Sequence, residues 1–257
     1  VGEAWTDEAT ILTLYESGID SLFNFPASDS TGRFVKAALA GKSSTVATAQ
    51  ADWNARIRAV SPASVDAPFV SNHDMARARG MLRSKVPNEK AAALLYLLMP
   101  GVPTVYYGEE LGMSGSGSDE NKRLPMVWSS DAATQCKAPA AADQAQRLTD
   151  GVAEQDSDPD SLLNWYRQLI ALRNLAPELT RGEMTALDGG NDAICAYTVT
   201  DAGSTVAIIS NVSQKDTLTV SLDVLRGAEL LGGIGGAAFA DGTANLPPLS
   251  GIIVRLP

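Results

Sequence analysis

The sequence is poor in the residues from which many metal and redox sites are built. Its 257 residues include one histidine and two cysteines, Cys136 and Cys195. The cysteines lie far apart and lack the spacing of metal ligands, so no metal site is predicted in this chain. Two interpretations remain open for them, namely two unpaired, partly buried thiols or one disulfide bridge.

Positive charge is also scarce. Twenty Lys and Arg residues stand against 30 Asp and Glu residues, which gives a net charge of −10. Nucleic acids and anionic membrane surfaces are bound by basic faces, so this balance disfavours both as partners. A neutral ligand such as a sugar is compatible with it. No apolar stretch reaches the roughly 18 to 20 residues of a membrane span, and no signal peptide is visible.

The apolar content is that of a soluble globular protein, with 45% hydrophobic residues. Up to about residue 180, short apolar runs alternate with helical patterns, which predicts an α/β domain with a parallel sheet. Strands are expected at 21–25, 68–71 and 104–107, and helices at 7–15, 32–40, 50–61, 89–99 and 161–175. Glycine, serine and proline predict loops at 111–119 and over much of 123–160.

The pattern changes after about residue 181. Short runs rich in β-branched residues are separated by Gly, Asp, Asn and Pro, which is typical of an all-β module. These runs lie at 193–199, 205–210, 217–222 and 251–256. The sequence therefore predicts two domains, an α/β domain over residues 1–180 and a β-sandwich over residues 181–257.

One stretch concentrates polar, titratable residues at the end of an apolar run. It reads Phe-Val-Ser-Asn-His-Asp over residues 69–74 and contains the only histidine of the chain, His73, followed by Asp74. Strands of α/β barrels present catalytic groups in this way, at their C-terminal ends. A lone histidine is by itself more often structural than functional.

Five stretches together resemble the α-amylase family of glycoside hydrolases, in the order in which that family has them. They are GEAW (2–5), FVSNHD (69–74), GVPTVYYGEELGM (101–113), RLPMVW (123–128) and SLLNWYRQLIALR (161–173). The resemblance implies strands 5 to 8 of a (β/α)8 TIM barrel, which is its C-terminal half. It also implies that residues 181–257 are the family's C-terminal β-domain.

The resemblance also implies roles for individual residues. A retaining glycosidase needs a carboxyl group that acts as acid and then base, and a second that acts as nucleophile. Glu3 matches the family's acid/base residue, and Asp74 matches the carboxylate that stabilises the transition state. His73 would bind the same sugar ring by a hydrogen bond.

Four further residues are candidates for substrate binding: Trp5, Arg77, Tyr107 and Trp128. Aromatic rings stack on the faces of sugars, and Trp128 is therefore either a sugar platform or an anchor for its own loop. Tyr107 either faces the cleft or packs in the core. Arg77 either contacts the sugar or pairs with a nearby carboxylate.

The family's nucleophile is an aspartate in a Gly-x-Arg-x-Asp segment at the end of strand 4, and these 257 residues contain no such segment. The family's first conserved segment, which has its own histidine, is also missing. We therefore expect the chain to be the C-terminal part of a longer amylase and to be inactive alone. A missing N-terminal half or a second copy would complete the barrel. No cofactor is expected in this chain, and calcium, where present, would belong to the missing part.

The function that the resemblance implies is hydrolysis of α-glucans such as starch and maltooligosaccharides, with retention of configuration. Two alternatives remain, an oligo-α-1,6-glucosidase or transglycosylase of the same family and a non-catalytic binding or scaffold subunit. Residues 181–257 have only two aromatic residues, Tyr197 and Phe239, which favours a structural cap over a carbohydrate-binding module. We expect a secreted or cell-surface bacterial protein rather than a cytoplasmic one.

Overall fold

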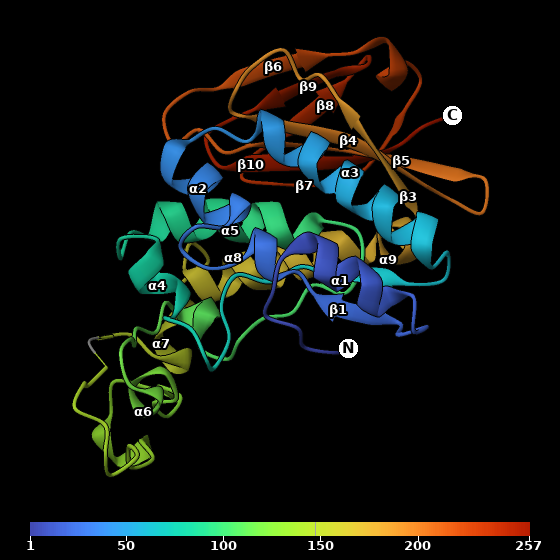
Figure 1. The fold of residues 1–257 in the computed structure, drawn as a ribbon. Coiled ribbons are helices and arrows are strands. Elements are labelled where there is room, and N and C mark those ends of the chain that lie inside the picture. The colour runs from blue at the N-terminus through green and yellow to red at the C-terminus, as the bar shows by residue number, and fades with distance from the viewer. Residues whose placement is uncertain (147) are drawn as a thin grey trace.

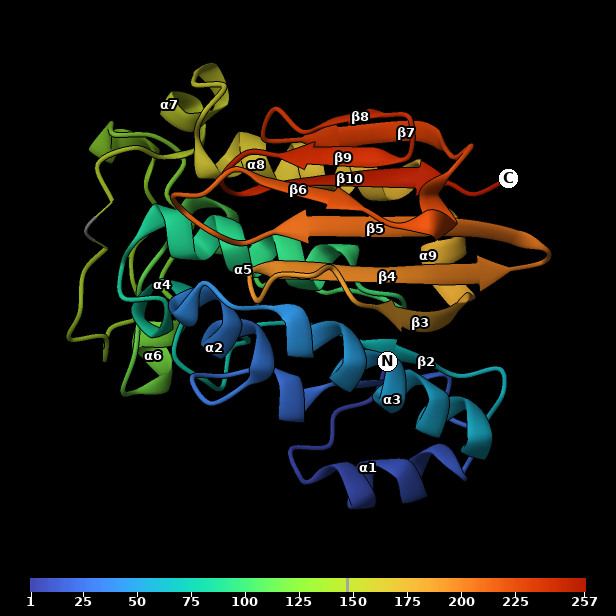
Figure 2. The same cartoon turned by 90° about the horizontal axis from the view of Figure 1, so that it is seen from above.

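The computed structural model describes residues 1–146 and 148–257 (Figure 1). An α/β part with short parallel strands lies against a β part with two antiparallel sheets (Figures 1 and 2). The predicted fold class, a partial (β/α)8 barrel followed by an all-β sandwich, is therefore confirmed. The domain boundary at residue 180 stays a prediction.

Four parallel segments form the strand layer of the α/β part. β1 (Ser21–Phe23) pairs in parallel with β2 (Val65–Ala67), and Gly2 forms a single parallel bridge to Leu22 of β1. The extended segment 102–104 lies on the other side of β2. The spatial order of the segments thus follows their order in the chain, as in consecutive strands of a TIM barrel.

The fourth segment lacks a regular ladder because its partner contains a proline. The N–H of Val102 donates to the carbonyl of Asp66 at 2.8 Å, and the N–H of Thr104 donates to that of Pro68 at 2.9 Å. In a parallel pair the two strands donate alternately. Pro68 has no N–H, so the intervening bond is missing.

The strands expected at 68–71 and 104–107 are therefore wrong in position. The ladder of β2 ends at Ala67, and only residues 102–104 of the later run are paired. Gly101 has a φ of 109°, and a Cβ there would lie 2.2 Å from the carbonyl oxygen of Asp66. Only glycine permits this close approach of the two segments.

Helices surround this strand layer, and all five expected helices are present. The long ones are α1 (Glu8–Tyr15), α2 (Arg33–Ala40), α3 (Ser44–Val60), α5 (Val86–Leu98) and α8 (Leu162–Asn174). The helix α3 begins six residues before the expected start at residue 50, because its first turns are small and polar and lack an apolar stripe. Short helices occur at η1 (Phe25–Ala27), α4 (Ala78–Met81) and α9 (Glu178–Arg181).

The helix α5 is the centre of the molecule. Every residue from Ala91 to Leu98 is buried, because the helix lies between α8 and the β part (Figure 1). A helix that is apolar all round is suited to such a position. Arg173 of α8 caps its C-terminal end by donating to the carbonyls of Leu97 and Met99 at 2.9 and 2.6 Å.

The region between the last parallel segment and α8 is mostly irregular and projects from the body (Figure 1). Its described residues, 105–146 and 148–161, contain four short helices, namely η2 (Glu109–Leu111), α6 (Asp119–Lys122), η3 (Ala132–Thr134) and α7 (Val152–Ser157). The loops expected at 111–119 and over much of 123–160 are confirmed apart from these short helices, except at residue 147, which lies outside the described residues. A small apolar cluster anchors the region to α8, and its buried members are Leu111, Met113, Leu124, Val127 and Leu163.

The β part consists of a five-stranded and a three-stranded sheet. The first has the order β3-β4-β5-β10-β7 and the second the order β6-β9-β8. The strands are β3 (Glu183–Leu187), β4 (Ile194–Asp201), β5 (Ser204–Asn211), β6 (Leu218–Ser221), β7 (Glu229–Ile234), β8 (Ala238–Ala240), β9 (Thr243–Leu246) and β10 (Ser250–Arg255). Four of them, namely β4, β5, β6 and β10, match the expected runs.

The large sheet is buried on both faces. Alternate residues of β4 point in opposite directions, so Ile194 and Ala196 pack between the two sheets. Cys195, Tyr197 and Val199 pack on the other face, in the core that includes α5. The β part therefore covers the α/β part as a structural cap.

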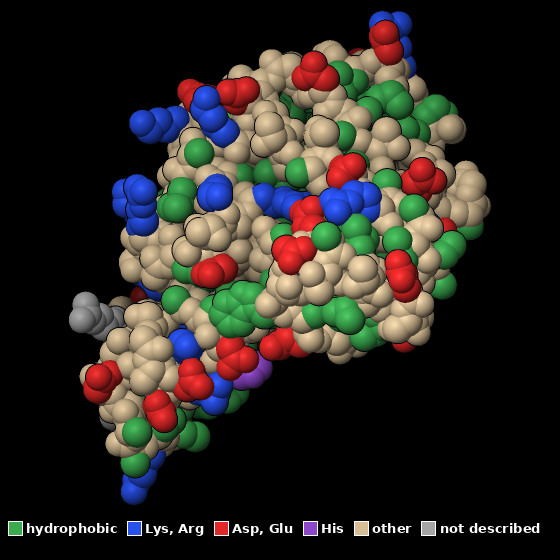
Figure 3. All heavy atoms as spheres, viewed as in Figure 1, with side chains coloured by type: hydrophobic (Ala, Val, Ile, Leu, Met, Phe, Trp, Pro, Cys, Tyr) green, Lys and Arg blue, Asp and Glu red, His purple; other side chains and the backbone are tan. Residues whose placement is uncertain are grey.

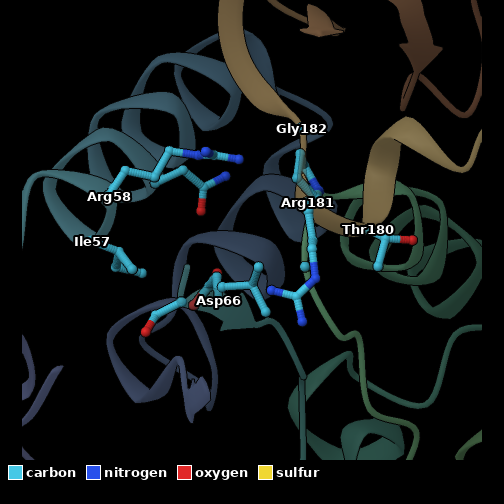
Figure 4. Close-up of a pocket in the computed structure, with 11 residues that line it drawn as sticks. Ile57, Arg58, Asp66, Thr180, Arg181 and Gly182 are labelled. Atoms are coloured by element: carbon cyan, nitrogen blue, oxygen red, sulfur yellow. The ribbon is translucent and has the colours of Figure 1, made fainter. Parts of the chain in front are cut away.

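A small cleft lies where the two parts meet (Figure 4). Ile57 and Arg58 of α3 face Thr180 and Arg181 of α9 across it, with Asp66 of β2 at its base. The guanidinium of Arg181 donates to the carbonyl of Ala63 at 2.7 Å and spans the cleft. The cleft is at the N-terminal ends of the parallel segments, the side of a barrel associated with stability rather than catalysis.

The two cysteines do not form a disulfide bond. Cys136 is exposed, Cys195 is buried, and both are free thiols. The interpretation as two unpaired thiols is therefore correct. Within residues 1–146 and 148–257, no helix combines the length and the apolar character that a membrane crossing requires.

Candidate active site

The C-terminal ends of the four parallel segments lie side by side, and most of the predicted site residues follow these ends. We call residues 3–5, 24–25, 68–74 and 105–107, which come directly after the segments, the carboxyl edge. Active sites of TIM-barrel enzymes are built at this face. The structure therefore gathers Glu3, Trp5, His73, Asp74 and Tyr107 on one edge of the strand layer.

Aromatic rings connect three of the segments along the carboxyl edge. The indole of Trp5 stacks on Phe25 with 5.1 Å between ring centroids and 18° between planes. Phe25 meets Phe69 edge-on, also at 5.1 Å. The side chain of Trp5 is 57% exposed, so part of its ring is open to a ligand.

His73 and Asp74 lie in a turn that the preceding residue holds. The side-chain oxygen of Asn72 accepts from the N–H groups of Asp74 and Met75 at 2.9 and 3.2 Å. This turn places Nε2 of His73 3.3 Å from a carboxylate oxygen of Asp74. Both side chains are partly open to solvent, so a ligand can reach them.

A second loop meets the same carboxylate. Nη2 of Arg123 lies 2.8 Å from the other oxygen of Asp74, and Nε of Arg123 donates to the carbonyl of His73 at 3.3 Å. Nζ of Lys122 donates to the carbonyl of Asp74 at 2.9 Å. Neither Arg123 nor Lys122 is among the site residues that the sequence predicts. Only the position of Arg123 at the start of the RLPMVW stretch points to it in the sequence.

The geometry brings opposite charges together at this point of the surface. Figure 3 shows the histidine side chain in purple with acidic and basic side chains next to it. Charge-assisted hydrogen bonds fix a carboxylate more firmly than neutral ones. The hydrogen bond from Arg123 therefore sets the direction of the Asp74 carboxylate, and His73 lies against its other oxygen.

Arg77 is not a substrate-binding residue in this structure, and that prediction is wrong. Its side chain is only 1% exposed and lies over the rings of Tyr106 and Tyr107, at 4.6 and 4.5 Å. It donates to the carbonyls of Lys122 and Tyr107 at 2.8 and 2.6 Å. Burial lowers the pKa of the guanidinium, against the opposing effect of the two tyrosines. Arg77 joins the last parallel segment to the loop that carries Arg123.

Tyr107 and Trp128 are both partly exposed, but they are placed differently. The phenol of Tyr107 donates to the carbonyl of Leu124 at 2.7 Å, and its ring packs edge-on against Tyr106. Trp128 is 50% exposed, and its backbone carbonyl accepts from the N–H of Ala153 at 3.0 Å. Tyr107 thus belongs to the carboxyl edge, whereas Trp128 lies in the projecting loop. Their contact with substrate stays a prediction.

Glu3 follows the single bridge of Gly2 and is exposed. Within the described part of the chain, its carboxylate accepts no hydrogen bond. The proton donor of a glycosidase works in a partly dehydrated environment. The described residues of this chain leave Glu3 exposed to solvent instead of partly dehydrated, and its catalytic role stays a prediction.

Glu109 faces the interior rather than the carboxyl edge. Its side chain is buried and accepts hydrogen bonds from Ser71, Tyr96 and Tyr166. Burial raises its pKa to about 7, against the opposing effect of these three hydroxyls. Among residues 1–146 and 148–257, no group of three or more His, Cys, Asp and Glu residues could hold a metal ion.

Known proteins are similar to this chain. The family described as "Alpha amylase, catalytic domain" matches residues 1–182. Alpha-amylase 3 of Dictyoglomus thermophilum is 26% identical over 260 residues, which cover 100% of this chain and 51% of that protein. Alpha-amylase SusG of Bacteroides thetaiotaomicron is 34% identical over 156 residues, which cover 57% of this chain and 22% of that protein.

Solved structures agree. Eubacterium rectale Amy13B superposes with a TM-score of 0.91 and 33% identity, over 100% of this chain and 52% of that one. An alpha-amylase from H. orenii superposes with a TM-score of 0.86 over 100% of this chain and 53% of that one. At 24% identity, the second likeness shows the fold alone. The chain spans at most about half the length of the curated relatives named here.

The family match extends over the whole α/β part and includes the residues of the carboxyl edge. The parallel segments follow one another in the order that the five stretches imply, and the His–Asp stretch comes after β2. The chain therefore belongs to the α-amylase family of glycoside hydrolases.

Proposed function

We propose that this chain supplies one side of the active site of a retaining hydrolase of α-glucans, such as starch and maltooligosaccharides. The arrangement of His73, Asp74 and Arg123 at the carboxyl edge carries the proposal. The oriented carboxylate and the imidazole share the carboxyl edge with Trp5, whose indole is stacked on Phe25 and partly exposed. A sugar ring stacked on that indole would present its hydroxyls to these groups.

Each residue has a distinct task in this proposal. Asp74 stabilises the positive charge of the oxocarbenium-like transition state, because its carboxylate is already oriented by Arg123. His73 binds a hydroxyl of the same sugar through its exposed ring. Glu3 donates a proton to the leaving oxygen and then activates water. Tyr107 and Trp128 extend the substrate contacts along the edge and onto the projecting loop.

The attacking carboxylate must come from outside these residues. The 257 residues contain no Gly-x-Arg-x-Asp segment. We therefore propose that they do not hydrolyse glucan alone, and that an N-terminal barrel half or a second copy completes the site. Calcium, where the enzyme uses it, would bind in that other part. We further propose that the enzyme is secreted or displayed at a bacterial cell surface.

Reducing-end release from maltoheptaose tests the proposal. The 257-residue chain and the polypeptide translated from the complete gene are compared, each with Glu3→Gln and with Glu16→Gln, an exposed control on the surface. We expect hydrolysis only by the second polypeptide. Glu3→Gln should lower its kcat by about 10²- to 10⁴-fold, and Glu16→Gln should leave it unchanged.

The alternatives give different results in the same assay. Hydrolysis by the 257-residue chain that Glu3→Gln abolishes would refute the incomplete site. Equal activity of Glu3→Gln and the parent would refute the role of Glu3. Cleavage of isomaltooligosaccharides, or transfer products, would indicate the oligo-α-1,6-glucosidase or transglycosylase. Binding of maltoheptaose without cleavage by the polypeptide of the complete gene would indicate a scaffold subunit.

A further inference from the structure

One buried carboxyl group, that of Glu109, has no role in the site described above. It begins η2, directly after Gly108, whose φ of 79° turns the chain inward at the end of the last parallel segment. The side chain of Glu109 thereby enters the core between α5 and α8 instead of facing solvent. A buried carboxyl group needs hydrogen-bond donors, because its desolvation is costly.

The donors to Glu109 come from three different elements. One oxygen accepts from the hydroxyls of Tyr96 in α5 and Tyr166 in α8, at 2.8 and 2.9 Å. The other accepts from the hydroxyl of Ser71 at 2.8 Å. Ser71 precedes His73 by two residues in the stretch that follows β2. A single side chain thus joins that stretch to the two innermost helices.

We propose that Glu109 is a positioning residue, which holds Ser71 against α5 and α8 and thereby fixes the backbone that carries His73 and Asp74. This inference deepens the proposed function and rests on it. In this proposal, a residue that follows the last parallel segment, 102–104, supports the stretch that follows β2. Glu109 itself does not touch substrate.

The carboxylate form suits this task better than an amide. All three hydroxyls can donate to a carboxylate, since it only accepts. Burial also keeps both tyrosines protonated, because it raises the pKa of Tyr96 and of Tyr166 well above the usual value. An amide at position 109 would turn its NH2 group either toward Ser71 or toward the two tyrosines. At least one of the three hydroxyls would then lose its acceptor.

A role in core packing alone would predict a different pattern of effects. It would lower the stability of the whole chain without changing the surroundings of His73 in particular. Glu178 provides a matched control, since it is also a buried glutamate that accepts from a serine, Ser204, at 2.6 Å. It lies at the junction with the β part, away from the carboxyl edge.

The chain has one histidine, so the ring signal of His73 in a ¹H–¹³C NMR spectrum is unambiguous. We compare Glu109→Gln, Ser71→Ala and Glu178→Gln in the 257-residue chain at about pH 8, where Glu109 is mainly ionised. The first two variants should shift the His73 signal in the same direction, and Glu178→Gln should leave it in place. Urea unfolding of all three gives the accompanying change in stability.

A His73 signal that stays in place in both Glu109→Gln and Ser71→Ala would refute the proposal, as would an equal shift in Glu178→Gln. If Glu109→Gln does not fold, the His73 signal of Ser71→Ala, which removes only one hydroxyl, tests the proposal instead. In the polypeptide of the complete gene, we expect Glu109→Gln to lower kcat up to about 100-fold with little change in KM. Absence of hydrolysis by the parent would refute the proposed function, while the NMR comparison would still decide the positioning role.

Discussion

The stability of the chain should depend on pH through Asp66, a buried carboxyl group of β2 that is 2% exposed. One of its oxygens accepts from the indole N–H of Trp53 at 2.9 Å. The other accepts from the amides of Asn24 and Gln50, at 2.9 and 2.5 Å. These bonds tie β2 to α3 and to the end of β1.

Burial raises the pKa of Asp66 from 3.8 to about 6, although the three donors and the nearby Arg33 oppose the change. Tyr15 also faces it, but burial raises the pKa of that phenol, which stays neutral here. Between about pH 4 and pH 6, the folded chain therefore keeps a proton that the unfolded chain has lost. The contribution of protonated Asp66 is complete below about pH 4 and is lost as the pH rises through about 6. At about 1.4 kcal/mol per pH unit, this loss is about 3 kcal/mol.

Asp66→Asn separates this charge effect from the hydrogen bonds. The amide must turn its NH2 group toward Trp53 or toward Asn24 and Gln50, so at least one buried donor loses its acceptor. That loss costs about 1–3 kcal/mol at any pH. The variant cannot ionise, so it avoids the penalty that the parent has at high pH. We therefore expect the variant to be less stable at about pH 4 and close to the parent at about pH 8.

Urea unfolding followed by tryptophan fluorescence measures both stabilities across this pH range. Asp52→Asn is the control, because Asp52 is an exposed residue of the same helix, α3, as Trp53. The stability difference between Asp66→Asn and the parent should change by about 3 kcal/mol between about pH 4 and pH 8. A difference that is the same at both pH values would refute the reasoning. So would an equal change in Asp52→Asn.

Two further predictions concern groups that the fold encloses. Arg77→Met keeps much of the side-chain volume but removes the donors to the carbonyls of Lys122 and Tyr107. We therefore expect the free energy of unfolding, measured in urea, to fall by about 2–4 kcal/mol. A decrease below about 0.5 kcal/mol would contradict this prediction. A disulfide-exchange reagent should modify one thiol in the folded chain and two in urea. Cys136 is exposed, whereas Cys195 is buried, and burial raises the pKa of its thiol to about 12. Modification of both thiols in the folded chain would contradict this prediction.

The helices could be predicted from the sequence because their signals are local. The end of α2 is marked by Gly41 in the left-handed region, and α8 begins after Ser161, whose hydroxyl accepts from the N–H of Asn164. The parallel strands were harder to place, because each is only three residues long. The effect of Pro68 on its partner depends on pairing across the sheet. The strand β7 was missed because Gly232 and Gly233 interrupt its apolar pattern.

The site could be predicted only where its residues are neighbours in the chain. His73 and Asp74 are adjacent, so their motif was visible, and the structure pairs their side chains. The wrong prediction for Arg77 has a physical reason, since an arginine in a polar, Arg-rich stretch is usually exposed. The rings that enclose it are about 30 residues further along the chain. Arg123 meets Asp74 across 49 residues, and no periodicity reveals such a contact.

Both ends of the stretch from β2 to His73 are held by elements that this chain contains. Asp66 fastens the strand to α3, and Glu109 fastens Ser71 to α5 and α8. The position of the His–Asp pair should therefore depend little on the proposed barrel half or second copy that would complete the strand layer. Glu3 differs, because one bridge at Gly2 holds its segment and the side chain is exposed. A completing barrel half would thus change the surroundings of Glu3 far more than those of Asp74, and Glu3, the proposed proton donor, is the group whose chemistry would depend on that addition.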